Sequence, residues 1–415
     1  MMKNNFIYSS DKVLSYLGID PKKIKDIRST LKRSHYRSAI NWLTIYSPNS
    51  NSSNLEKVKG LLEAFYQFSE IEEWDIASKV ISIPLNTPTN QALYNQLKTW
   101  GYYGEQIDIY QRLLGKINSD WDTICIDGLG NATRALGKWD QSREYYQQQL
   151  KKSKTIIDPD TKITALIGLA NNFKFQCQYQ QATNYYLQVS EIAFENSNHK
   201  GRIMALAGLG SVLTCLGQYE MALEYHQQQL AIARKNDDNL AQAEALTNLC
   251  CIYYFIKDYK QAIKYQNQSY KIAIQVENKE LEAKALLYKG MISHQQWENK
   301  EAINCYEQSL ELISDMGLIL EKAEVLANLA ISERELEKEN IKKLQEKILD
   351  RFQQALSIFN KCGNSVQIAN LLKEIAKTYD LTGDFDMAKK YCQEALEMKI
   401  KFNLALEKEC RELQT

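Results

Sequence analysis

The side chains in this sequence best suited to binding a ligand are an asparagine and a basic residue three positions later. An asparagine offers both a hydrogen-bond donor and an acceptor, so it can bind a peptide backbone whatever the sequence of that peptide. A cation three residues on shares a helix face with it and can pair with a carboxylate or phosphate. The pattern occurs three times: Asn95 with Lys98, Asn131 with Arg134, and Asn171 with Lys174.

Further along the chain, the two positions of this pattern carry less basic residues. They become Ser211 and Thr214, then Cys251 and Tyr254, then Met291 and His294. If these segments line one groove, the groove changes from polar and basic to more apolar, and a protein partner with an acidic stretch beside an apolar one would fit it. The alternative is that the amides and cations only solvate helix faces.

Patterns typical of enzymes are absent from the sequence. It contains no Walker A loop, no G-x-S-x-G and no HExxH. GLGNA at 128–132 lies in helical pattern with no strand before it, and the carboxylate pairs Glu72 with Glu73 and Glu321 with Glu324 suit a solvated helix face. We therefore expect no enzymatic activity and no cofactor.

A metal site is not expected either. None of the four histidines (His35, His199, His226 and His294) lies three or four residues from a cysteine or another histidine. Cys251 and His294 form the one pair that could converge from neighbouring repeats. The nine cysteines include no CxxC pair and fall mostly in apolar helical pattern, which indicates buried thiols in a reducing compartment.

Composition favours long helices joined by short turns. The 415 residues include only 17 glycines and 5 prolines, and 51 basic residues balance 51 acidic ones, so no global field favours nucleic acid or a membrane. No signal peptide is evident, and no run of about 18 apolar residues could span a bilayer. The sequence predicts a cytoplasmic protein without a membrane span.

The sequence repeats itself every 40 residues. This shift superimposes Ala182, Ala222, Ala262 and Ala302 in one column, and Trp139, Tyr179, Tyr219 and Tyr259 in another. Small residues on the first helix of each repeat and the alanines on the second allow two antiparallel helices to approach closely. Gly137 and Gly217 fall where the first helix must end. The tyrosine column Tyr145, Tyr185, Tyr225 and Tyr265 is interpreted as packing between hairpins.

The pattern L-G/A…G-x-Y/W-x-x-A…Y resembles the tetratricopeptide signature over residues 88–400. A period of 40 is similar to the long-helix branch of that family, found in Partner-of-Inscuteable-like adaptors, kinesin light chains and many bacterial scaffolds. The resemblance implies an all-α, right-handed superhelical solenoid of about seven or eight helical hairpins. It also implies a groove that binds a protein or peptide. Asp127 and Ile167 depart from the clamp of chaperone-binding relatives, so chaperone tails are not expected.

The edges of the array are less regular, and we divide the chain accordingly. We predict a basic helical segment at 1–46, a linker at 47–54, a degenerate capping hairpin at 55–87, the repeat array at 88–400 and a capping helix end at 401–415. A charged insert, ELEKENIKKLQEKILD at 335–350, delays the alanine Ala355 and should lengthen its hairpin.

Residues 21–37 contain the one strongly basic stretch, with Lys22, Lys23, Lys25, Arg28, Lys32, Arg33 and Arg37. This segment either docks on the first hairpin or contacts nucleic acid, an anionic membrane or an acidic protein.

Three functional hypotheses follow. The first is a non-enzymatic scaffold or adaptor that binds an extended or helical segment of a partner protein in its concave groove. The second is a partner-sensing switch that acts through the basic segment. The third, resting on similarity to repeat proteins abundant in photosynthetic bacteria, is an assembly factor for a photosynthetic or pigment-protein complex.

Overall fold

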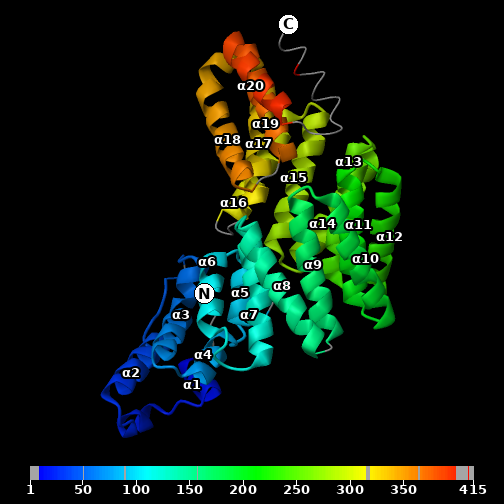
Figure 1. The fold of residues 1–415 in the computed structure, drawn as a ribbon. Coiled ribbons are helices and arrows are strands. Elements are labelled where there is room, and N and C mark those ends of the chain that lie inside the picture. Colours follow the sequence, from blue (N-terminus) through cyan, green and yellow to red (C-terminus); the bar gives the residue numbers. More distant parts are fainter. Residues whose placement is uncertain are drawn as a thin grey trace. The chain divides into compact units, whose positions relative to one another are not determined.

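The computed structural model describes residues 9–49, 51–87, 90–156, 158–314, 318–362, 365–398 and 410. These residues are almost entirely helical (Figure 1), and an isolated β-bridge between Pro84 and Ala92 is the one piece of β-structure among them. The predicted all-α solenoid is thereby confirmed. The chain forms two compact units, Met1–Thr133 and Arg134–Thr415.

The first unit consists of short and medium helices. They are α1 (Ser10–Leu17), η1 (Pro21–Asp26), α2 (Thr30–Thr44), α3 (Asn54–Glu70), α4 (Trp74–Ile81), α5 (Leu93–Thr99), α6 (Tyr103–Leu113) and α7 (Ser119–Ala135), whose last two residues belong to the second unit. Helices α3 and α4 form the hairpin expected at 55–87, and α2 packs against α3 across the predicted linker. The boundary between the compact units lies elsewhere than this linker, and the predicted domain limits stay predictions.

The second unit consists of longer helices that pack consecutively. They are α8 (Trp139–Ile156), α9 (Pro159–Phe175), α10 (Tyr179–Glu195), α11 (His199–Cys215), α12 (Tyr219–Lys235), α13 (Asn239–Phe255), α14 (Tyr259–Gln275), α15 (Lys279–Gln295), α16 (Asn299–Ile313), α17 (Ile319–Leu336), η2 (Lys338–Asn340), α18 (Ile341–Cys362), α19 (Ser365–Thr382) and α20 (Phe385–Glu397). The described helices α5 to α20 correspond to eight pairs in sequence, in agreement with the seven or eight predicted. The handedness of the superhelix stays a prediction.

Helix ends in the regular repeats follow the 40-residue period because the capping residues do. The side chain of the residue before each first helix accepts a hydrogen bond from a backbone N–H of its first turn. These caps are Asp158, Asn198, Asp238 and Asn278. Each first helix then ends in a residue of left-handed conformation, as predicted for Gly137 and Gly217. At the equivalent positions Cys177, Lys257 and Trp297 adopt the same positive φ.

Buried rings on the second helices fill the space between hairpins. Tyr186 is 1% exposed, and its ring occupies the position that a Cβ on Gly208 of the next hairpin would need. In the same way, the Tyr146 ring occupies the position that a Cβ on Gly168 would need. This column, one residue after the predicted tyrosine column, continues as His226, Gln266 and Tyr306. The predicted column also packs, as when Tyr185 stacks on Phe173 with ring centroids 5.5 Å apart.

The charged insert lengthens its hairpin, as predicted. Its first residues end α17 and form η2, and the rest begins α18, which is 22 residues long. Helix α18 still places Ala355 in the apolar core that it shares with α17 and α19. Of the predicted C-terminal cap at 401–415, Cys410 alone lies within the described residues.

Candidate partner-binding groove

The first helices of successive hairpins present polar side chains to a shared space. Neighbouring first helices from α9 to α17 touch one another directly. Burial raises the pKa of Cys215 on α11, Cys251 on α13 and Tyr288 on α15, and the charge of Glu324 on α17 raises each further. Because such effects weaken rapidly with distance, side chains from four helices must lie near one another.

We call this surface the inner face of the array. It carries charged, thiol and hydroxyl groups from five first helices and from the end of α7. Its members are Arg134, Lys174, Cys215, Glu244, Cys251, Lys284, Tyr288 and Glu324. A chain segment placed there would meet side chains from several hairpins at once.

Two cations occupy the beginning of the inner face. The Arg134 guanidinium lies 5.6 Å and the Lys174 ammonium 5.1 Å from the centroid of the Phe175 ring. That ring stacks on Trp139 with centroids 5.5 Å apart, so the aromatic support is fixed. In the described part of the chain neither cation forms an ion pair.

The two cations are also incompletely compensated. Nε of Arg134 is buried without a hydrogen-bond partner. Burial lowers the pKa of Lys174 to about 8; the charges of Arg134 and Lys284 also lower it, whereas Cys215 and Glu244 act in the opposite direction. An anionic group bound between Arg134 and Lys174 would relieve both conditions.

Glu324, which forms no ion pair among the described residues, occupies the far end of the inner face. Burial, assisted by the charge of Glu321, raises the pKa of Glu324 to about 7. Lys284 is nearby but pairs with Glu280 at 2.5 Å and Glu321 at 3.3 Å. The inner face is therefore basic at α7 and α9 and acidic at α17.

The structure places the predicted amide and cation pairs unevenly. Asn171 and Lys174 lie one turn apart on α9, and the Asn171 Oδ1 accepts a 2.6 Å hydrogen bond from the Tyr186 hydroxyl. Asn131 donates to the backbone oxygen of Asp127 in its own helix, at 3.0 Å. Each of these two amides therefore has only part of its hydrogen-bonding capacity left for a ligand. Asn95 and Lys98 are exposed on α5 in the first compact unit. The role of these residues as partner contacts stays a prediction.

The later predicted positions are half-buried and mostly engaged. Ser211 and Thr214 donate to backbone oxygens of α11, at 2.7 and 2.9 Å. The Tyr254 hydroxyl accepts from Gln295 at 3.3 Å, and His294 Nδ1 lies 2.9 Å from both Asn299 and Ser332 oxygens. The described residues contain no cluster of three or more potential metal ligands.

Charged residues two turns before the predicted positions also lie on the inner face, although they were not among the predicted contacts. Glu244, Lys284 and Glu324 recur 40 residues apart, seven residues before Cys251, Met291 and Ile331. Residues seven apart share a helix face, so extending the predicted face by two turns would have found this column. The glutamate pair Glu321 and Glu324 was interpreted only as a solvated face, whereas Glu324 lies on the inner face.

The basic N-terminal segment makes contacts with the first hairpin. Helix α2 packs on α3, and Lys32 pairs with Glu73 at the beginning of α4, at 2.9 Å. Arg33 donates to the backbone oxygen of Ile27. Lys22, Lys23, Lys25, Arg28 and Arg37 are exposed.

Comparisons with known proteins agree with the repeat structure. A tetratricopeptide-repeat family model matches residues 122–193 and 202–275, and a model of the MukF C-terminal domain matches residues 272–403. No curated protein matches the chain in sequence. No helix of the described residues has the length and apolar character needed to cross a bilayer.

Three solved structures share the fold. A Rap protein complexed with competence and sporulation factor is 14% identical, covering 96% of this chain and 99% of that chain with a TM-score of 0.58. A Rap conjugation gene regulator of plasmid pLS20, complexed with the Phr* peptide, is 13% identical. The match covers 86% of this chain and 96% of that chain, with a TM-score of 0.57. A chain of the APC/C hetero-tetramer Cut9–Hcn1 is 15% identical. The match covers 100% of this chain and 68% of that chain, with a TM-score of 0.56. At such identities the similarity concerns the fold alone.

Proposed function

Because this chain is a tetratricopeptide-repeat protein, we propose that it is a non-enzymatic scaffold that holds an extended segment of a partner protein along its inner face. Repeat arrays of this kind are protein-interaction scaffolds, and their curved surfaces accommodate long segments. Two of the proteins that share the fold were solved in complex with a ligand, one with competence and sporulation factor and the other with the Phr* peptide. The side chains of the inner face indicate the chemistry of the segment that would bind there.

The observation that supports the proposal best is the pair of cations on Phe175. Arg134 and Lys174 lie together on a fixed aromatic ring, one with a buried donor that has no partner and the other with a lowered pKa. Keeping two like charges together lowers stability unless a ligand compensates them. An Asp, a Glu or a phosphorylated residue of the partner would do so.

The remainder of the inner face defines the rest of the partner segment. Cys215, Cys251 and Tyr288 provide soft, weakly polar surface in the middle, and Glu324 provides a carboxylate at α17 that is unpaired within the described part of the chain. The segment should therefore carry an acidic group at one end, apolar residues in the middle and a basic group at the other. Opposite charges at the two ends would also fix its direction in the groove.

The experiment begins with affinity capture from the native cell followed by mass spectrometry. Captured proteins are compared between the wild-type chain and the double variant Arg134→Gln with Lys174→Gln. A true partner should bind the variant about tenfold more weakly or worse, because two charge-assisted contacts are lost. The affinity for its synthetic segment, measured by fluorescence polarisation, should depend less on salt.

The matched control removes one arginine and one lysine elsewhere in the same unit. Arg234→Gln with Lys235→Gln changes the net charge equally, and both residues are exposed at the end of α12. This control should bind as the wild type does. If the groove variant keeps full affinity for the identified partner, the proposed site is wrong.

The switch hypothesis remains a second candidate because several cations between Lys22 and Arg37 are exposed. Deletion of residues 1–50 separates the two functions. A scaffold should retain its partner, whereas a switch should retain the partner and lose its downstream effect. Nucleic acid as the ligand of this segment, a cytoplasmic location and a role in photosynthetic assembly stay predictions.

A further inference from the structure

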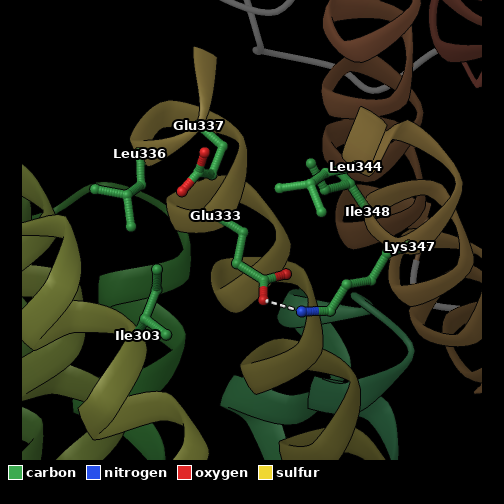
Figure 2. A pocket seen from close by; sticks show the side chains of 7 residues that line it. All are labelled: Ile303, Glu333, Leu336, Glu337, Leu344, Lys347 and Ile348. Carbon is green, nitrogen blue, oxygen red and sulfur yellow. Dashed lines mark hydrogen bonds and ion pairs between the residues drawn. The ribbon is translucent and has the colours of Figure 1, made fainter. Parts of the chain in front are cut away.

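A cavity of about 160 Å³ lies where α17 ends and α18 begins, away from the residues of the inner face. Figure 2 shows Glu333, Leu336 and Glu337 on one side, with Leu344, Lys347 and Ile348 opposite and Ile303 below. Four of these seven lining residues are aliphatic, two are carboxylates and one is a lysine. The cavity therefore combines an apolar wall with two carboxylates, of which Glu333 pairs with Lys347 and with Arg351, a residue outside the lining.

The charged insert builds this cavity. In the regular repeats the second helix begins four residues after the first one ends, as between Gln295 and Asn299. Here η2 lies between the two helices, so α18 begins five residues after α17 ends, and α18 itself is 22 residues long. Five lining residues belong to the insert: Leu336, Glu337, Leu344, Lys347 and Ile348. Insertions in repeat proteins are common places for added binding surfaces.

Glu333 gives the cavity its chemical character. The residue is 8% exposed, and its Oε1 accepts from Lys347 at 2.9 Å and pairs with Arg351 at 3.2 Å. Its Oε2 is buried and has no hydrogen-bond partner. A buried carboxylate oxygen without a donor is unfavourable, so the site favours a ligand that supplies an N–H group. Glu337 adds a second carboxylate to the lining and forms no ion pair among the described residues.

We propose that this cavity receives the side chain of a lysine or arginine from a protein partner. The aliphatic stem would pack against Ile303, Leu344 and Ile348, as the stems of long basic side chains do on apolar surfaces. The cationic head would donate to Glu333 Oε2 and lie beside Glu337. The site is independent of the inner face, because none of its lining residues belongs to that surface.

The test uses methyl NMR on the full chain with labelled isoleucine and leucine methyl groups, since four such residues line the cavity. The probes are Nα-acetyl-lysine N-methylamide, the arginine equivalent and the uncharged norleucine equivalent. Both cationic probes should shift the Ile303, Leu344 and Ile348 methyl signals in a saturable and salt-sensitive way. The norleucine probe should bind at least about tenfold more weakly, because it cannot donate to Glu333.

Two single substitutions control for general charge effects. Glu337→Gln should weaken binding of the lysine probe about threefold, and Glu339→Gln, an exposed residue of η2 outside the cavity, should leave it unchanged. Glu333→Gln should abolish binding while the other methyl signals remain those of the folded protein. Equal shifts with norleucine, no shift with either cationic probe, or equal losses in Glu337→Gln and Glu339→Gln would each overturn the proposal.

Discussion

Lys174 on α9 and Arg334 on α17 occupy the same position of the repeat, four periods of 40 residues apart, yet their surroundings differ completely. Lys174 forms no ion pair among the described residues and lies on the inner face. Arg334 is 3% exposed and donates to the Glu374 carboxylate at 2.7 Å, the Glu374 backbone oxygen at 2.9 Å and Thr378 at 3.3 Å. One cation is half-buried without an ion pair among the described residues, and the other is part of the core.

The difference comes from the first helix of the following hairpin. Glu374 lies nine residues before Gly383, the left-handed residue that ends α19. In α11 the residue nine positions before Gly217 is Gly208, whose place beside the backbone is filled by the Tyr186 ring. Gly208 leaves room for the Tyr186 ring and has no side chain that could carry a counter-charge. Glu374, in contrast, pairs with Arg334 of the preceding hairpin. The same repeat position can therefore serve either recognition or packing.

The largest expected effect comes from removing the core cation. Arg334→Met leaves Glu374 buried without its main partner and should lower the free energy of unfolding by about 3–5 kcal/mol. Lys174→Met, at the equivalent position, should leave stability unchanged or slightly raised, because a cation with a lowered pKa is already unfavourable there. Urea unfolding followed by circular dichroism measures both. Similar losses in the two variants would remove the distinction between the two sites.

The second-largest effect is the loss of stability in acid that we expect from Glu374, the partner of Arg334. Burial alone would raise the pKa of Glu374, but Arg334, Lys377 and Lys373 lower it to about 2. A carboxylate with a lowered pKa stabilises the fold above its unfolded pKa near 4.3, and this contribution is lost as the pH falls toward 2. We expect a loss of about 2–3 kcal/mol between pH 5 and pH 2 from this residue. Glu374→Gln, compared by urea unfolding at both pH values, should lose that much less. An identical pH dependence in wild type and variant would contradict the assignment.

In the regular repeats, stability should be most sensitive to substitution of the glycines against which buried rings pack. Gly208→Ala places a methyl group into the ring of Tyr186, which is buried and held by its hydrogen bond to Asn171. Overpacking of this kind should cost about 2 kcal/mol, measured by chemical denaturation. Gly104→Ala in α6, where no atom lies within 4 Å of the new Cβ, is the matched control and should be neutral or stabilising by up to ~1 kcal/mol. A neutral Gly208→Ala would show that Tyr186 can move.

The smallest effect concerns binding at Lys174. Lys174 has a pKa of about 8, mainly because of burial, so it loses its charge as the pH rises through that value. The affinity for an acidic partner segment should therefore fall about fivefold, ~1 kcal/mol, between pH 7 and pH 9.5. The measurement is best made in a Glu324→Gln background, because Glu324 titrates near pH 7 and faces the same space. Lys174→Arg should remove the pH dependence, and its persistence there would assign it to another group.

The repeat and its helices were predictable from the sequence because their causes are local. A period of 40 is visible in Ala182, Ala222 and Ala262, and the caps and left-handed turns recur with it. That Arg134 and Lys174 lie near each other was also predictable, since they fall at equivalent positions of successive repeats, whereas their role as partner contacts stays a prediction. The lengthening of the hairpin around Ala355 followed from the spacing alone. All of these depend on contacts within one hairpin or on strict repetition.

What the sequence did not determine was which charges find a partner. Arg334 is buried because Glu374 of α19 pairs with it, and α11 has Gly208 at the position equivalent to Glu374. The inner position of Glu324 and the cavity at Glu333 likewise depend on how separate helices converge. Burial and electrostatic pairing are properties of this convergence, because desolvation and Coulomb energy depend on distances in space and not on distance along the chain. Sequence periodicity thus determined the helical repeat, and tertiary packing decided which of its charges are paired.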